Sequence, residues 1–310
     1  CVCTYICILV FFVIIWSSAF TSARIIVLYS SPLAALSIRF FISGLIGVFI
    51  ALALGQSFKL TKSQWRATFV FGLCQNALYL GLNFVAMQSI EASLAAIIAS
   101  TMPLMVAFAG WLFVSERLSS SGVLGLVLGF SGVTIIMWAR LNHGVDIFGL
   151  VLCVIGALAL TVATLTLKDA SSGGNIMMIV GLQMLVGSAV LAVFCLLFEN
   201  IHFSLNSSFV LAFAYTTIFP GLVATVVWFK LVNHIGAVKA ATYHFLNPFF
   251  GVVIAWLFLR ETISYMDAVG VIVITVGIYM VQTSKRKSEQ ANSSIRAVSY
   301  THLTLPTTLV

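Results

Sequence analysis

The chain has 310 residues, of which 61% are apolar and 7% are charged, and its mean hydropathy is +1.15. This balance excludes an ordinary soluble domain and indicates a polytopic membrane protein. The net charge of +7 does not indicate a nucleic-acid partner, because Lys and Arg lie in short loops and the tail, where they set topology and meet anionic lipid.

A helix needs about 20 apolar residues to cross the hydrocarbon core of a bilayer. Ten such runs can be placed, with turn and interface residues between them: 5–28, 33–54, 65–87, 92–113, 120–139, 147–167, 175–198, 208–231, 237–259 and 266–283. We therefore predict an all-α membrane protein with ten transmembrane helices. Residues 285–310 are expected to form a disordered cytoplasmic tail, whose end from about residue 297 resembles translated sequencing adapter.

Polar and aromatic residues within the first two runs are candidates for substrate binding. Trp16 and Phe20 share one face of the first helix, where they either stack on a substrate or pack against other helices. Arg39 lies in the second helix without an acidic residue in that helix. It either receives a carboxylate of the substrate or extends to the outer interface of the membrane.

The third run carries a polar face. Asn76, Tyr79 and Asn83 recur at positions i, i+3 and i+7, and Gln75 lies beside them. Polar side chains within a membrane helix usually face the bundle interior or a cavity. Two roles remain open for them, namely lining a substrate cavity and joining helices by hydrogen bonds.

The fourth and fifth runs contain a proline, a glutamate and a row of glycines. Pro103 has no N–H and so deprives the carbonyl of Ala99 of its helical partner, which makes it a candidate hinge. Glu116 follows the fourth helix and Glu261 follows the ninth, and both are interpreted as loop tethers, not proton carriers. Four glycines form a small-residue stripe on the fifth helix, whose partner is either the other edge helix of the chain or a second protomer in a homodimer: Gly122, Gly125, Gly129 and Gly132.

The same pattern returns near the end of the chain at a constant spacing of 145 residues. The stretch from Ala92 to Gly132 recurs from Ala237 to Gly277, with Pro103 matched by Pro248 and Glu116 matched by Glu261. The repeat aligns the sequence of the fourth and fifth helices with that of the ninth and tenth. Since a shift of five helices is odd, the two halves run in opposite directions through the membrane. We predict two inverted five-helix repeats, 1–141 and 142–284, an architecture of secondary transporters.

The ninth run combines a proline with polar neighbours. Tyr243, His244 and Asn247 lie beside Pro248, a second candidate hinge, which frees the carbonyl of His244. These residues either belong to a substrate site or accompany a simple packing kink. His244 is also the candidate proton carrier within the membrane, because histidine titrates near neutral pH. Without proton coupling, transport would be facilitated.

Orientation follows from the basic residues. With the amino terminus inside, and with the adapter-like end of the tail and the Arg296 that borders it left out, ten Lys and Arg residues fall on or near the cytoplasmic side. Four fall towards the other side: Arg24, Arg39, Arg140 and Arg260. This excess predicts that both termini are cytoplasmic.

Several of these features together resemble the EamA family of the drug/metabolite transporter superfamily. They are the two five-helix halves, Trp16 in the first helix, Pro32 and Arg39 in the second, and the helix-ending sequences that begin at Glu116 and Glu261. The resemblance implies a carrier of the bacterial inner membrane, often an exporter, for amino acids or other small metabolites. The chain departs from the family at Arg260, where a Gly commonly precedes the Glu.

We therefore expect a secondary transporter that moves a small polar metabolite by alternating access, with export as the expected direction. The first alternative is a channel, which would need rings of charge or filter residues. The second is a membrane-embedded enzyme, which would need clustered acidic or histidine residues within the membrane. The chain shows neither pattern, and no metal site or cofactor is expected because its six cysteines lie in apolar runs without a paired histidine.

Overall fold

The structure is a computed structural model that describes residues 2–113, 119–142, 144–170, 175–235 and 246–303. Within these residues the secondary structure is helical, and the only strand-like pairing is an isolated bridge between Ser30 and Phe203. Nine helical segments of the described chain are long and apolar enough to cross a membrane, and a shorter apolar helix accompanies them. The prediction of an all-α polytopic membrane protein is confirmed.

The helical segments follow the predicted apolar runs closely. In chain order they are α1 (Val2–Tyr29), α2 (Pro32–Ala53), α3 (Lys62–Phe71), η1 (Gly72–Leu80), α4 (Gly81–Ala86), α5 (Ala92–Ala99), α6 (Met102–Phe113), α7 (Ser120–Asn142), α8 (Ile147–Ala170), α9 (Ile176–Phe198), α10 (Ser207–Thr216), η2 (Thr217–Val223), α11 (Ala224–Ile235), α13 (Asn247–Leu259) and α14 (Tyr265–Leu303). The first part of the ninth run, with Tyr243 and His244, lies outside the described residues, as does Glu116.

Several helix starts are explained by local sequence. Pro32 occupies the first turn of α2, where its missing N–H costs no hydrogen bond. Thr61 and Gln64 form a capping box at the start of α3. The Asn206 side chain accepts a hydrogen bond of 2.8 Å from the N–H of Phe209 and so begins α10. The apolar runs supply the helices, and these residues set where they begin.

The third and eighth membrane segments are interrupted in the same way. Each changes from α-helix to π-helix and back, with η1 beginning at Gly72 and η2 at Thr217. These starts lie 145 residues apart, which is the spacing of the sequence repeat. Pro220 inside η2 accounts for the lost helical bonding there. Segments of π-helix are frequent at functional sites.

The fourth segment is interrupted at its predicted hinge, and the described helix of the ninth segment begins at the equivalent position. The break between α5 and α6 falls at Ser100 and Thr101, and α6 begins at Met102, one residue before Pro103. Likewise α13 begins at Asn247, one residue before Pro248. The hydroxyls of Ser100 and Thr101 donate hydrogen bonds of 2.6 Å to the carbonyls of Ala96 and Ile98. The repeat is thus visible in backbone geometry as well as in sequence.

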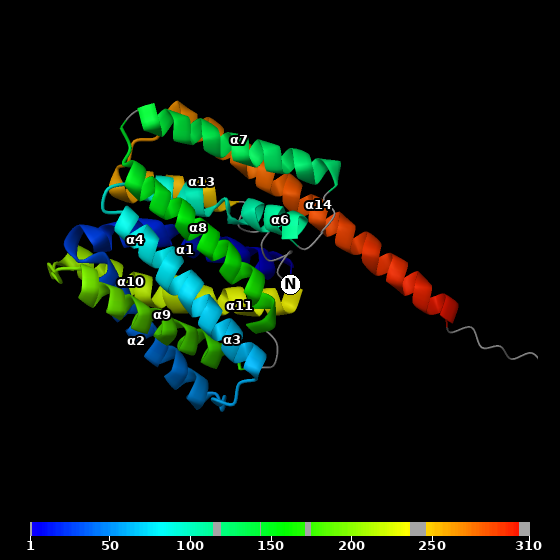
Figure 1. Ribbon diagram of the computed structural model, residues 1–310, viewed down its shortest axis with the longest axis horizontal. Helices are drawn as coiled ribbons and strands as arrows, with labels where there is room; N and C mark the ends of the chain where they lie inside the picture. The colour runs from blue at the N-terminus through cyan, green and yellow to red at the C-terminus, as the bar shows by residue number, and fades with distance from the viewer. Residues whose placement is uncertain (1, 114–118, 143, 171–174, 236–245, 304–310) are drawn as a thin grey trace, which may run out of the picture.

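Repeat-related helices lie side by side at the two edges of the bundle. Figure 1 shows α7 against α14 at one edge and α2 with α9 towards the other. A Cβ on Gly47 of α2 would lie 3.0 Å from the Cα of Gly181 in α9, and one on Gly277 of α14 would lie 2.6 Å from the Cα of Gly129 in α7. The glycine stripe of α7 therefore faces α14 within the chain. The predicted homodimer, which stays a prediction, would have to use the outer faces of these helices.

Two glutamates join the ends of helices from different halves. Glu261, which follows α13, accepts hydrogen bonds of 2.8 and 2.9 Å from the N–H groups of Ala92 and Ser93 at the start of α5. Glu199, which follows α9, accepts two bonds of 2.9 Å from the first turn of α2. Carboxylates at helix N-termini satisfy free N–H groups and the helix dipole. The interpretation of Glu261 as a tether is confirmed by these bonds.

The carboxyl end of α13 explains the position where this chain departs from the family. Arg260 has a φ of 57°, and it is the only non-glycine residue of the described chain with positive φ. Such a left-handed residue after a helix is usually Gly, because a Cβ is disfavoured there.

The last helix runs beyond the apolar segment. α14 continues to Leu303 through residues that were expected to form a disordered tail. The sequence contains no Gly or Pro between Ile278 and Leu305 that would end a helix.

Candidate substrate-binding cavity

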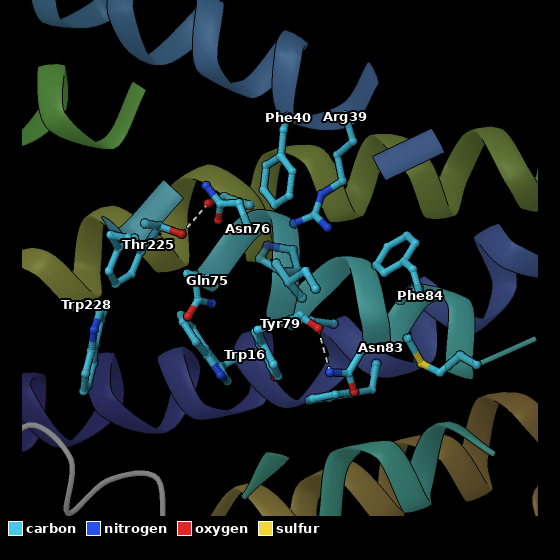
Figure 2. Close-up of a pocket in the computed structure, with 18 residues that line it drawn as sticks. Trp16, Arg39, Phe40, Gln75, Asn76, Tyr79, Asn83, Phe84, Thr225 and Trp228 are labelled. Atoms are coloured by element: carbon cyan, nitrogen blue, oxygen red, sulfur yellow. Dashed lines mark hydrogen bonds between the residues drawn. The ribbon is translucent and has the colours of Figure 1, made fainter. Parts of the chain in front are cut away.

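A cavity of about 50 Å³ lies in the bundle between the first, second, third and eighth membrane segments. Six of the predicted substrate-binding residues line it, and Figure 2 shows most of them pointing inward from their helices: Trp16, Phe20, Arg39, Asn76, Tyr79 and Asn83. The structure therefore brings together residues that the sequence placed on three separate helices.

The two sides of the cavity are formed by matching residues of the two halves. From the third segment come Gln75, Asn76, Leu80 and Asn83, and from the eighth come Pro220, Gly221, Thr225 and Trp228. Each residue of the second set follows its counterpart by 145 positions. Repeat-related positions thus face one space from opposite halves of the chain.

Arg39 is the single cation of this cavity. Its side chain is 4% exposed, and its Cζ lies 4.9 Å from the ring centroid of Phe40. The guanidinium forms no hydrogen bond with the described residues, and its Nε is buried without a partner. In Figure 2 the group points into the space near Phe40 and Phe84. Of the two predicted roles, its position corresponds to the one inside the bundle.

Asn76 and Asn83 line the cavity and also bond to the protein. Asn76 Nδ2 donates to the backbone carbonyl and to Oε1 of Gln183 in α9, at 2.9 and 2.5 Å. Asn83 Nδ2 donates at 2.8 Å to the carbonyl of Tyr79, at the end of the π-helical segment. The Cys153 thiol donates to Asn83 Oδ1 at 3.4 Å. The two roles left open by the sequence, cavity lining and helix joining, are both present in these residues.

Tyr79 and Gln75 leave polar atoms available to a ligand. The Tyr79 side chain is 3% exposed, and no hydrogen bond of its hydroxyl is found among the described residues. Oε1 of Gln75 is buried without a hydrogen-bond partner in that part of the chain. A buried polar atom without a partner costs about 1–3 kcal/mol. Both atoms therefore favour occupation of the cavity by a polar solute or water.

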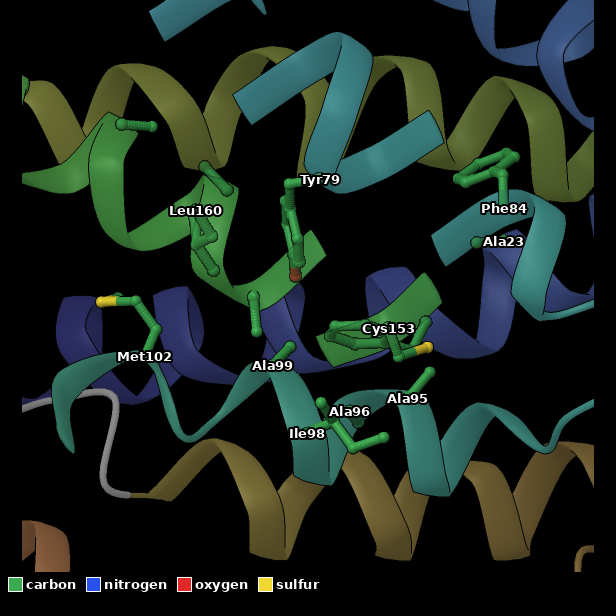
Figure 3. Close-up of a cluster of buried hydrophobic side chains, with 14 of the residues drawn as sticks. Ala23, Tyr79, Phe84, Ala95, Ala96, Ile98, Ala99, Met102, Cys153 and Leu160 are labelled. Carbon is green, nitrogen blue, oxygen red and sulfur yellow. The ribbon is translucent and has the colours of Figure 1, made fainter. Parts of the chain in front are cut away.

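Asn247 lies in an adjoining cavity of about 20 Å³ that shares three walls with the first, namely Trp16, Phe20 and Tyr79. Pro103 lines this second space as well. Ser17 Oγ donates to Asn247 Oδ1 at 3.5 Å. Figure 3 shows the apolar side chains that close this region towards α5, α6 and α8, among them Ala99, Met102 and Leu160. Residues beside both candidate hinges therefore reach the region, although Tyr243 and His244 lie outside the described residues.

Aromatic rings form much of the remaining wall. Trp16 and Trp228 lie with their ring centroids 6.3 Å apart, and Phe12 stacks on Trp228 at 6.1 Å with an interplanar angle of 8°. Trp228 and several other lining residues were not predicted from the sequence: Phe40, Phe71, Phe84, Pro220, Gly221 and Thr225. The signal that could have found the eighth-segment residues is the spacing of 145, had it been applied to the polar face of the third helix.

Comparisons with known proteins agree with this architecture. The model of the EamA-like transporter family matches residues 4–138 and 147–283. The uncharacterized transporter YvbV of Bacillus subtilis is 28% identical over 284 residues, which cover 91% of this chain and 92% of that protein. The uncharacterized inner membrane transporter YedA of Escherichia coli is 26% identical over 285 residues, covering 86% of this chain and 89% of YedA.

A plant protein and a solved structure are also similar. A chloroplastic WAT1-related protein of Arabidopsis thaliana is 24% identical over 276 residues, covering 86% of this chain and 66% of that protein. A crystal structure that is 19% identical has a TM-score of 0.66, over 90% of this chain and 96% of its own, and so shows the same fold. The family match spans both halves, and the chain is a multi-pass membrane transporter that belongs to the EamA-like transporter family.

Proposed function

We propose that this transporter is a secondary carrier of the bacterial inner membrane that moves a small polar organic solute, such as an amino acid or a related metabolite, by alternating access. Export is the proposed direction, and the uneven distribution of Lys and Arg supports a cytoplasmic position for both termini. The observation that carries the proposal is the cavity whose opposite walls are repeat-related residues of the third and eighth segments. Inverted-repeat carriers bind substrate at such an interface, beside interrupted helices.

The size of the cavity supports a moving carrier over an open pore. A water molecule needs roughly 10–15 Å³ of such volume, so about 50 Å³ holds only a few waters. A solute the size of an amino acid would fit only after the surrounding helices separate. Alternating access provides that separation on one side at a time, whereas a channel would need a continuous path.

Counterflow in liposomes separates the carrier from the alternative channel and enzyme. Vesicles that hold purified protein and an unlabelled amino-acid mixture would be diluted into labelled amino acids of the same mixture. A carrier should accumulate label transiently by exchange, whereas a channel only dissipates the gradient and an enzyme changes the solute chemically. Absence of counterflow with the amino acids and with related small metabolites would contradict the proposal.

The binding residues can be tested by a change that removes one atom. Tyr79→Phe deletes a hydroxyl that has no hydrogen-bond partner among the described residues. The change should weaken the apparent affinity for the transported solute by about 0.5–1.5 kcal/mol, the usual value of a hydrogen bond. Tyr265→Phe is the matched control, because Tyr265 is 79% exposed at the start of α14. Asn76→Ala should also weaken transport, but it removes the bonds to Gln183 and is expected to reduce the yield of folded protein as well. Unchanged affinity in Tyr79→Phe and Asn76→Ala would place the site elsewhere.

A further inference from the structure

The charges around the cavity limit which solute it can hold. We propose that the substrate is an organic monoanion, a carboxylate on a flat apolar body, and that zwitterionic amino acids and cations bind less well. This inference rests on the proposed carrier function and narrows its substrate class. Its basis is a buried guanidinium without a hydrogen-bond partner among the described residues, in a cavity whose lining offers an ammonium group no carboxylate.

The first step concerns Arg39. A charge placed within a protein and away from water is stable only when it is paired or hydrogen-bonded. Arg39 is 4% exposed, and apart from its contact with the ring of Phe40 it has no partner among the described residues. Guanidinium groups bind carboxylates through two parallel hydrogen bonds. A carboxylate in the cavity would therefore supply the missing partner.

The second step concerns the opposite charge. No Asp or Glu is among the residues that line either cavity. All eight acidic residues of the sequence lie near helix ends, in connecting segments or in the tail, and those of the described chain that cap or bridge helices are already occupied, such as Glu199 and Glu261. The ammonium of an amino acid would therefore lose its hydration without gaining a carboxylate. Since Arg39 is the one cation that lines the cavity, a dianion would likewise keep one charge unpaired.

The third step concerns the body of the solute. Aromatic rings of Trp16, Phe40 and Trp228 form flat walls, which suit a planar apolar group. Gln75 adds one buried oxygen without a hydrogen-bond partner. A donor on the solute, such as an amide N–H or a hydroxyl, would satisfy that oxygen. The predicted class is thus a planar or aromatic monocarboxylate, favoured further by one such donor.

Binding to the purified full chain in detergent tests the class directly. The probes are three acids, benzoate, 3-phenylpropionate and hippurate, each paired with its neutral amide, together with phenylalanine as the zwitterion. Tryptophan fluorescence reports binding, because Trp16 and Trp228 line the cavity. We expect at least one acid to bind about tenfold or more tightly than its amide, as a charge-assisted hydrogen bond predicts, and more tightly than phenylalanine. Equal binding of all three acids and their amides, tighter binding of phenylalanine, or no binding of any probe would overturn the inference.

Variants assign the preference to Arg39. Arg39→Gln should abolish the difference between acid and amide, and Arg39→Lys should restore part of it, because lysine keeps the charge and loses the planar fork. Arg66→Gln, which removes an exposed arginine of α3, is the matched control and should keep the preference. Gln75→Glu places a carboxylate in the cavity and should weaken the acids and strengthen phenylalanine. This variant tests the proposal even where Arg39→Gln fails to fold. A preference that survives in Arg39→Gln, or that Gln75→Glu leaves unchanged, would overturn it.

Counterflow of the same probes separates the two proposals. Acid-selective binding without counterflow of any probe would contradict the carrier function and leave the anion site standing. Counterflow of phenylalanine with no preference for the acids would leave the carrier standing and overturn the anion site.

Discussion

Arg140 at the end of α7 joins three helices, and its removal should show how strongly they are held. Its Nε and Nη2 bond to the two carboxylate oxygens of Asp267 in α14, at 3.2 and 2.8 Å. Its Nη1 bonds at 2.5 Å to Glu91, which precedes α5. The side chain of Asp267 is 1% exposed and that of Arg140 16%, whereas that of Glu91 is 35% exposed.

These exposures predict unequal energies for the two ion pairs. Removing one partner of a buried pair leaves an uncompensated charge and typically costs about 3–5 kcal/mol. Asp267 retains a bond of 2.9 Å from the N–H of Ser264, so we place Arg140→Gln near the lower end, at about 3 kcal/mol. The pair with Glu91 is more exposed, and Glu91→Gln should therefore cost only about 0.2–1 kcal/mol.

The assay is reversible unfolding in detergent, followed by tryptophan fluorescence. Arg140→Gln and Glu91→Gln are compared with Asp267→Asn and with the double variant of Arg140 and Asp267. The double variant should be less destabilised than Arg140→Gln alone, because it leaves no buried carboxylate unpaired. If Arg140→Gln costs no more than Glu91→Gln, or if the double variant is the least stable, the assignment of a buried ion pair to these residues is refuted.

The other predictions concern topology and the backbone. In a background without native cysteines, Glu116→Cys should react with impermeant thiol reagents from the cytoplasmic side, and Glu261→Cys should react from the outside. Reaction of both variants from the same side of the membrane would contradict the inverted repeat. Gly277→Ala should lower the free energy of unfolding by about 1–3 kcal/mol, because the added Cβ would lie 2.6 Å from the Cα of Gly129. Gly129→Ala should lower it less, because its added Cβ would meet mainly the flexible side chain of Leu104. Equal losses of stability in thermal unfolding would argue against this packing. Arg260→Gly should raise the free energy of unfolding by roughly 1 kcal/mol, because it removes a Cβ from a left-handed position, and a fall measured by denaturant unfolding would contradict this.

The helical fold was predictable because each element depends on local sequence. Apolar runs of membrane length, Pro32 at a helix start and Pro103 at a helix break act within a few residues, and the structure has helices and a break at those places. The spacing of 145 also located the start of the described ninth-segment helix, since α6 and α13 begin at Met102 and Asn247. Local chemistry and the repeat were therefore sufficient to predict the helical membrane fold.

The candidate cavity was predictable only in part, because its completion depends on contacts between distant segments. The polar face of the third helix and Arg39 were visible from helical spacing and from a charge in an apolar run. The bond from Asn76 to Gln183 joins residues 107 positions apart and decides that Asn76 also holds α9. Trp228 lies in a run for which no polar face was predicted, although Thr225 lies three residues before it, and it reaches the cavity through the packing of η2 and α11. Such contacts are set by the tertiary arrangement, which periodicity does not contain.

The comparison of the two halves indicates how this fold separates transport from recognition. The third and eighth segments share a π-helical stretch at equivalent positions, yet Gln75 and Asn76 of the first half face Pro220 and Gly221 of the second. The backbone is repeated whereas the side chains at the cavity are not. Alternating access, as proposed, requires only that the two halves exchange conformations, which depends on the repeated backbone. Recognition, as proposed, depends mainly on polar and charged side chains of the first half, with Arg39 foremost among them, whereas Trp228 of the second half adds an aromatic wall. Substitutions in the first half can therefore change which solute is bound while the exchange between states is retained.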